Sequence, residues 1–194
     1  MLRSSLVCGI AVTFALSATG VAAQSAHVHG EGRLNIAIEG NRIVMALESP
    51  GADIVGFEYE AKSGKEEAAV SAALERLEKP LQLMRFVGDT ECRVSKASAE
   101  LESEGHDDDH GHDDDHGHDD DHGHDDHGEG EDVHSAFHAE YRIECDDIAA
   151  LSAIEFTYFD RFKNAQTLDI VLIDGSGQRR VEVDRTDPVL SLAR

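Results

Sequence analysis

A single low-complexity tract divides this chain and limits what the rest of it can fold into. Residues 106–128 consist of only three residue types: eight His, eleven Asp and four Gly. They form three copies of His-Asp-Asp-Asp-His-Gly and one shortened copy. Such polarity and charge offer nothing to a hydrophobic core, so the composition predicts a segment that is disordered without a ligand. The folded part must therefore come from the sequence on either side, with this His/Asp tract as a long inserted loop.

The His/Asp tract has the chemistry of a metal-binding segment. Each full unit offers two imidazoles and three carboxylates, and its glycine lets the backbone bring neighbouring units around one ion. Zinc accepts His nitrogen and carboxylate oxygen without a ligand-field preference for one geometry, and nickel and copper also accept imidazole. An acidic spacer that only improves solubility would need no regularly spaced His. The candidate ligands in the tract are His106, His110, His112, His116, His118, His122, His124 and His127.

The charge balance of the whole chain excludes two classes of partner. The chain carries 40 Asp and Glu against 17 Lys and Arg, a formal net charge of −23. A field of this sign repels phosphate backbones and anionic lipid. We therefore expect no nucleic-acid partner and no binding to a membrane surface.

Residues 1–23 have the pattern of a secretory signal peptide. Arg3 gives a positive start, an apolar run follows over 6–16, and Val21-Ala22-Ala23 places small residues at a cleavage site. A membrane span needs about 20 apolar residues, and this run is shorter. The sequence thus predicts export, with no membrane insertion after signal cleavage.

Two cysteines remain once the leader is removed, and exported proteins usually pair such cysteines. Cys92 precedes the His/Asp tract and Cys145 follows it. We expect a Cys92–Cys145 disulfide that staples the base of the inserted loop. Two unrelated free thiols are the alternative.

Apolar residues alternate with polar ones through much of the remaining sequence, which indicates strands. Residues 33–48 predict a hairpin around a two-residue turn at Gly40-Asn41. Residues 137–145 alternate most strictly and predict a strand with one apolar face. Other extended segments are predicted at 53–60, 83–87, 91–99, 154–159, 167–174 and 179–184.

One clear helix is predicted between these strands. Ser63 and Glu66 form a capping-box pattern, and Pro80 is expected to end the helix. A short helical turn is also expected after Asp146 or Asp147, up to about residue 153. The apolar stripe of the main helix consists of Val70, Leu74, Leu77 and Leu81.

Together these elements predict an α+β fold of mainly antiparallel strands with one or two short helices. The pattern is compatible with two structurally similar halves. We expect a signal peptide over 1–23, a first half of the folded domain over 24–103, a disordered metal-binding insert over 104–132 and a second half over 133–194.

Four His lie outside the tract as two close pairs, His27 with His29 and His134 with His138. The first pair precedes the predicted hairpin, where side chains two residues apart share a face in an extended segment. The second pair flanks the start of the strongest predicted strand. The four side chains are candidates for one structured site of higher affinity, and two unrelated surface pairs are the alternative.

The chain resembles the ZrgA family in several segments and in its His-rich insert. Among these segments are His27–Gly30, residues 49–53, Gly56-Phe57-Glu58 and residues 134–145. Members of this family are zinc-regulated periplasmic zinc-uptake proteins of Gram-negative bacteria. The resemblance implies a periplasmic location, Zn²⁺ as the bound ion, and a zinc importer or its binding protein as partner. Family members often carry a His after Gly-Phe-Glu, whereas this chain has Tyr59, which would weaken a structured site if that position is a ligand.

Two functions remain in competition. The first is a periplasmic protein that captures Zn²⁺ and assists its acquisition. The second is a periplasmic buffer or detoxifying sponge for zinc, nickel or copper, which would use the same tract without delivering its cargo. An enzyme is not expected, because the chain contains no His-Glu-x-x-His motif, nucleophile elbow or phosphate loop.

Overall fold

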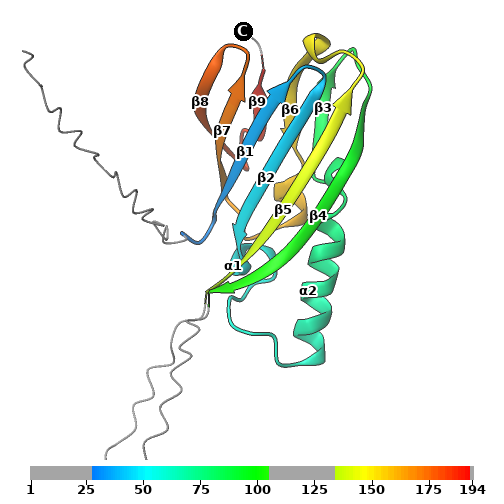
Figure 1. Ribbon diagram of the computed structural model, residues 1–194. Helices are drawn as coiled ribbons and strands as arrows, with labels where there is room; N and C mark the ends of the chain where they lie inside the picture. The colour runs from blue at the N-terminus through cyan, green and yellow to red at the C-terminus, as the bar shows by residue number, and fades with distance from the viewer. Residues whose placement is uncertain (1–27, 105–133, 193–194) are drawn as a thin grey trace, which may run out of the picture.

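The computed structural model describes residues 28–104 and 134–192, whose strands form two sheets that lie one behind the other (Figure 1). The strands are β1 (Glu31–Glu39), β2 (Arg42–Pro50), β3 (Met84–Gly88), β4 (Cys92–Glu104), β5 (His134–Cys145), β6 (Leu151–Phe156), β7 (Thr167–Asp174), β8 (Gly177–Asp184) and β9 (Val189–Ser191). The helices are α1 (Gly51–Ile54), α2 (Gly64–Leu77) and α3 (Tyr158–Arg161), with 3₁₀ turns η1 (Pro80–Gln82) and η2 (Ile148–Ala150). The predicted signal peptide, His27 and the His/Asp tract lie outside the described residues.

The larger sheet has six strands in the order β4-β5-β2-β1-β7-β8, and the smaller has three in the order β3-β6-β9. Within the described ranges every strand pair is antiparallel except β1 with β7. Each sheet contains strands that precede the tract in sequence and strands that follow it. The predicted α+β class with mainly antiparallel strands is therefore confirmed.

The core lies between the two sheets and follows from the alternation of apolar residues. On β5 the side chains of Phe137, Tyr141 and Ile143 are buried, whereas Glu140 and Arg142 point outward and are exposed. The same alternation on the neighbouring strands produces one continuous apolar layer. Its other buried members include Leu34, Ile36, Ile43, Met45, Leu168, Ile170, Leu172, Ile154 and Phe156.

The local predictions from turn and capping chemistry are confirmed. The β1–β2 hairpin closes through Gly40-Asn41, where Gly40 has a positive φ of 56° that suits glycine. At the start of α2 the Ser63 hydroxyl accepts a hydrogen bond from the Glu66 amide, and the Glu66 carboxylate accepts one from the Ser63 amide. Asp147 similarly caps η2, but this turn ends at Ala150 instead of about residue 153, because β6 begins at Leu151.

Several predictions of extended structure are wrong. Residues 53–60, expected as a strand, contain the end of α1 and a loop. Pro50, which precedes the first residue of α1, has a φ of −53°. Gly51 packs so closely on Ser135 that a Cβ at this position would lie 2.6 Å from the Ser135 hydroxyl. The strand expected at 154–159 ends at Phe156 and turns into α3, while β9 was not predicted.

Two boundaries also differ from expectation. β4 continues to Glu104, five residues beyond the predicted end at Ala99, because it remains paired with β5. Leu81 was assigned to the apolar stripe of the helix, but α2 ends at Leu77 and Leu81 is 51 % exposed on η1. A stripe inferred from helical spacing fails where the helix has already ended.

The predicted Cys92–Cys145 disulfide is present and joins directly opposite residues of β4 and β5. It does not staple the base of the inserted loop. That base is formed by Glu104 and His134, which are opposite each other at the other end of the same two strands. The 12 residues of β5 separate the two ends by about 35–40 Å.

Candidate metal centre

One end of the molecule brings together segments that are distant in sequence. β1 and β5 begin there and β2 and β4 end there, because each is antiparallel to its neighbour in this part of the sheet. α1 and the loop that follows it lie at the same end (Figure 1). His29, just before β1, and His134, the first residue of β5, therefore meet this loop where the tract is inserted.

The Glu58 carboxylate contacts both imidazole rings. His29 Nε2 lies 3.0 Å from Glu58 Oε1, and His134 Nδ1 lies 2.7 Å from Glu58 Oε2. The Glu58 side chain is only 10 % exposed, whereas His29 and His134 are 66 % and 50 % exposed. We refer to His29, Glu58 and His134 as the His–Glu–His cluster. It consists of a largely buried carboxylate beneath two accessible imidazoles.

The loop that carries Glu58 is fixed from both sides. The Asn164 side chain donates a hydrogen bond of 2.8 Å to the Ala52 carbonyl, and Gly56 adopts a positive φ of 90°. Tyr59 stacks on Phe57 with ring centroids 4.9 Å apart. Its hydroxyl donates to the Glu66 carboxylate at the start of α2. Tyr59, the residue after Gly-Phe-Glu, thus anchors the loop.

Electrostatics keep the Glu58 carboxylate ionised. Partial burial acts to raise the pKa of Glu58, but the hydrogen bond with His134 and the nearby His29 outweigh it, so the pKa lies below its usual range. An ionised carboxylate beside two imidazoles favours a cation at this position.

Asp53 of α1 is bonded to the residue after His29 and is 2 % exposed. Its Oδ1 accepts a hydrogen bond of 2.7 Å from the Gly30 amide, which holds the turn immediately after His29. Gly30 has a positive φ of 88°, and its carbonyl accepts bonds from the amides of Gln166 and Thr167. Burial raises the pKa of Asp53, although the Gly30 bond and the nearby His29 act in the opposite direction.

The structure separates His138 from the other predicted ligands. His138 lies four residues beyond His134 on β5, about 13 Å along the strand. Its Nε2 is 3.4 Å from Glu102 Oε2, and both line a groove on the outer face of the large sheet together with Glu100. The structure therefore brings together His29 and His134, and His138 has a different acidic neighbour.

Sequence reasoning did not identify Glu58 or Asp53 as parts of this centre. Glu58 was noted only within the Gly-Phe-Glu segment, and Asp53 only as the end of the resembling segment 49–53 and the start of an expected strand. Asp53 lies 24 positions after His29, and Glu58 lies 76 positions before His134. No spacing rule connects residues so far apart in the chain. Their positions depend on α1 and on the pairing of β2 with β5.

Within 28–104 and 134–192, no three His, Cys, Asp or Glu side chains are arranged as a ready metal cage. In the His–Glu–His cluster the donors contact one another through the Glu58 carboxylate. Metal binding there requires these contacts to open around an ion. The residue types fit zinc, which binds imidazole nitrogen and carboxylate oxygen.

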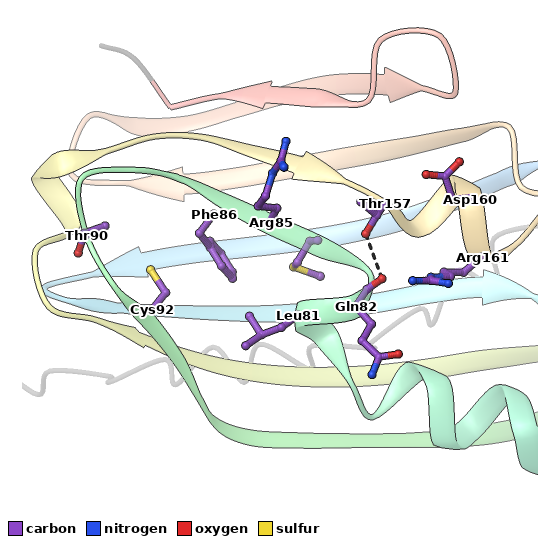
Figure 2. A pocket seen from close by; sticks show the side chains of 10 residues that line it. Leu81, Gln82, Arg85, Phe86, Thr90, Cys92, Thr157, Asp160 and Arg161 are labelled. Carbon is purple, nitrogen blue, oxygen red and sulfur yellow. Dashed lines mark hydrogen bonds between the residues drawn. The ribbon is translucent and has the colours of Figure 1, made fainter.

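A cleft elsewhere in the protein has a different character (Figure 2). It has a volume of about 630 Å³ and lies between β3, β4 and α3. Leu81 and Phe86 contribute apolar surface, and a hydrogen bond from the Thr157 hydroxyl to the Gln82 carbonyl spans one side. Its lining contains no His and a single carboxylate, that of Asp160, so it does not have the donors of a zinc site.

Residues 26–192 match the ZrgA family of zinc uptake proteins. The chain belongs to this family. The match includes the whole His–Glu–His cluster as well as the tract, and it confirms the resemblance seen in the sequence. No curated protein matches the chain.

Membership of the ZrgA family gives the protein a zinc-related role. The family is not known as one of enzymes, and its zinc-uptake description suggests a role outside the cytoplasm. No helix in the described part of the chain is long and apolar enough to cross a membrane.

Proposed function

We propose that this protein captures Zn²⁺ in the periplasm and supports its import, after cleavage of a signal peptide over 1–23. The His/Asp tract collects the ions, and the His–Glu–His cluster holds one ion on the folded part. The observation that carries this proposal is the position of the cluster at the insertion point of the tract. His134 is both a member of the cluster and the residue paired with Glu104 across the base of the loop.

The chemistry of the cluster supports zinc as cargo. Two imidazole nitrogens and a carboxylate are common zinc donors, and the absence of sulfur from the cluster disfavours Cu(I). The ionised Glu58 already holds both rings close to its carboxylate, and an ion enters when these contacts open around it. His27, two residues before His29, is a further candidate donor.

A metal buffer for zinc, nickel or copper is the second candidate, and the composition of the tract favours it equally. A sponge needs only the tract, whereas delivery needs a site from which a defined ion can be passed to a zinc importer or its binding protein. The His–Glu–His cluster at the base of the tract favours delivery for this reason.

The first prediction tests the two elements in the full-length mature chain. In a tract-silenced chain, all eight tract His are replaced by Ser. The intact protein should bind roughly two to four more zinc ions than this variant, because each site takes about two to four His with Asp completing the shell. The tract-silenced chain should retain one tightly bound ion, measured by isothermal titration calorimetry and metal analysis.

Single substitutions then locate the retained ion. In the tract-silenced chain, His29→Ala or His134→Ala should remove tight binding, and His138→Ala serves as the matched control that retains it. If the tract-silenced chain binds no zinc above background, the structured site does not exist. In chelated medium, a strain with only the tract-silenced protein should grow poorly if the tract feeds import, and normally if the tract is only a sponge.

A further inference from the structure

Two buried carboxylate oxygens at the metal centre have no hydrogen-bond partner. Among the described residues, buried side-chain atoms without a partner are Asp53 Oδ2, Glu58 Oε1, Tyr141 Oη and Arg179 Nε. Two of these four atoms thus belong to the same small region. Glu58 Oε1 has the His29 ring 3.0 Å away without a hydrogen-bond alignment, and Asp53 Oδ2 has no compensating contact.

The charge of Asp53 is not needed for the fold. Within 28–104 and 134–192, its only hydrogen bond is the one that Oδ1 accepts from the Gly30 amide, and a neutral Asn oxygen would accept the same bond. Burying a carboxylate without a pairing cation costs free energy. The buried hydroxyls of Ser49 and Tyr158 bond to each other at 2.9 Å, and among the described residues neither forms a hydrogen bond with Asp53. A buried charge with one unsatisfied oxygen therefore needs another explanation.

The groups around Asp53 indicate what would satisfy it. His29 belongs to the His–Glu–His cluster, and its ring lies 3.0 Å from Glu58 Oε1. His29 is also the residue before Gly30, to which Asp53 is bonded. The unsatisfied oxygen thus belongs to a region that already holds two imidazoles and an ionised carboxylate.

We propose that Asp53 is the fourth ligand of the structured zinc ion, binding it through Oδ2 alongside His29, Glu58 and His134. This proposal rests on the structured site proposed above. Two neutral imidazoles and two carboxylates form a four-coordinate shell whose charge balances Zn²⁺. Tetrahedral ligands at about 2.0–2.1 Å lie about 3.3 Å apart, close to the 3.0 Å between His29 Nε2 and Glu58 Oε1. The ion would satisfy both unpartnered oxygens at once.

The substitution Asp53→Asn in the tract-silenced full-length chain tests this proposal. Asn retains the shape and the acceptor for Gly30 but removes the charge. We expect zinc affinity to fall by at least about 10- to 100-fold, the range found even for residues that only support a ligand. The melting temperature of the zinc-free protein should stay equal or rise, because an unpaired buried charge has been removed. If Asp53 has only a structural role, the Asp53→Asn variant should melt at a lower temperature than its parent or bind zinc with unchanged affinity.

Asp169→Asn is the matched control. Asp169 is also buried, but its carboxylate is paired with Arg180, so this change should lower stability and leave zinc affinity intact. If Asp53→Asn binds zinc as tightly as the tract-silenced parent, Asp53 is not a ligand. The ion retained by the parent would still support the structured site in that case. Loss of the ion from the parent itself would instead overturn the proposed function.

A second measurement on the parent protein does not depend on how the variant folds. Zinc-edge X-ray absorption of the tract-silenced chain with one bound zinc counts imidazole ligands through their characteristic outer-shell scattering. Two imidazoles are expected from His29 and His134. Three or four would exclude Asp53 as the fourth ligand.

Discussion

At the scale of single residues, the sequence predicts the two His residues of the candidate metal centre but not its carboxylates. His29 and His134 were identifiable because His residues in close pairs beside predicted strands are uncommon outside metal sites. Glu58 and Asp53 were not, because Asp and Glu are abundant in this chain and only the tertiary fold selects two of them. Burial distinguishes these two carboxylates, and burial of a charged side chain cannot be deduced from its neighbours in sequence.

The titration of the cluster leads to a prediction for zinc binding. Glu58 has a lowered pKa, so it remains ionised as the pH falls from 7.5 to 5.5. An imidazole must be neutral to bind metal, so protons compete with zinc for both rings as the pH falls. Apparent zinc affinity should therefore fall steeply with falling pH. Calorimetry in buffers of different ionisation enthalpy should reveal proton release, and heats independent of the buffer would contradict this.

At the scale of elements, the predictions that succeeded depended on short-range chemistry. The β1–β2 turn and the capping box of α2 each require only a few adjacent residues, and both form as expected. α1 and β9 were missed because they are defined by what they pack against. α1 depends on the close contact of Gly51 with Ser135, and the three-residue β9 depends on pairing with β6. A pattern within one segment contains no information about such partners.

The capping box predicts how α2 responds to acid. The bonds that Glu66 accepts from the Ser63 and Lys62 amides, with the Tyr59 hydroxyl, lower the pKa of Glu66 to about 2. A carboxylate with a lowered pKa stabilises the folded state above its unfolded pKa, near 4.3, and loses that contribution as pH falls towards 2. Glu66→Gln should therefore reduce the melting temperature at pH 6, and the difference from the parent should shrink towards pH 2. A difference that is constant with pH would contradict the assignment.

At the scale of the whole molecule, the His/Asp tract interrupts the sequence but not the sheet. β4 and β5 pair from the disulfide at one end to Glu104 and His134 at the other, with one irregularity between Val94 and Lys96. The sequence predicted the bond between the two cysteines but placed it at the base of the loop, because the length of β4 was underestimated. The disulfide and the His–Glu–His cluster are consequently at opposite ends of the strand pair β4–β5, and their roles should be separable.

Replacing both cysteines tests this separation. The Cys92–Cys145 bond spans 53 positions, and cross-linking a loop of this length is worth about 4 kcal/mol through the entropy of the unfolded chain. Cys92→Ser with Cys145→Ser should therefore lower the melting temperature substantially under non-reducing conditions. Zinc binding at the His–Glu–His cluster should persist at temperatures where the variant is folded, because β4 and β5 remain paired over the intervening 35–40 Å. Thermal unfolding and zinc calorimetry on the same variant check both expectations, and a parallel loss of zinc affinity in the folded variant would show that the two ends of the strand pair are coupled.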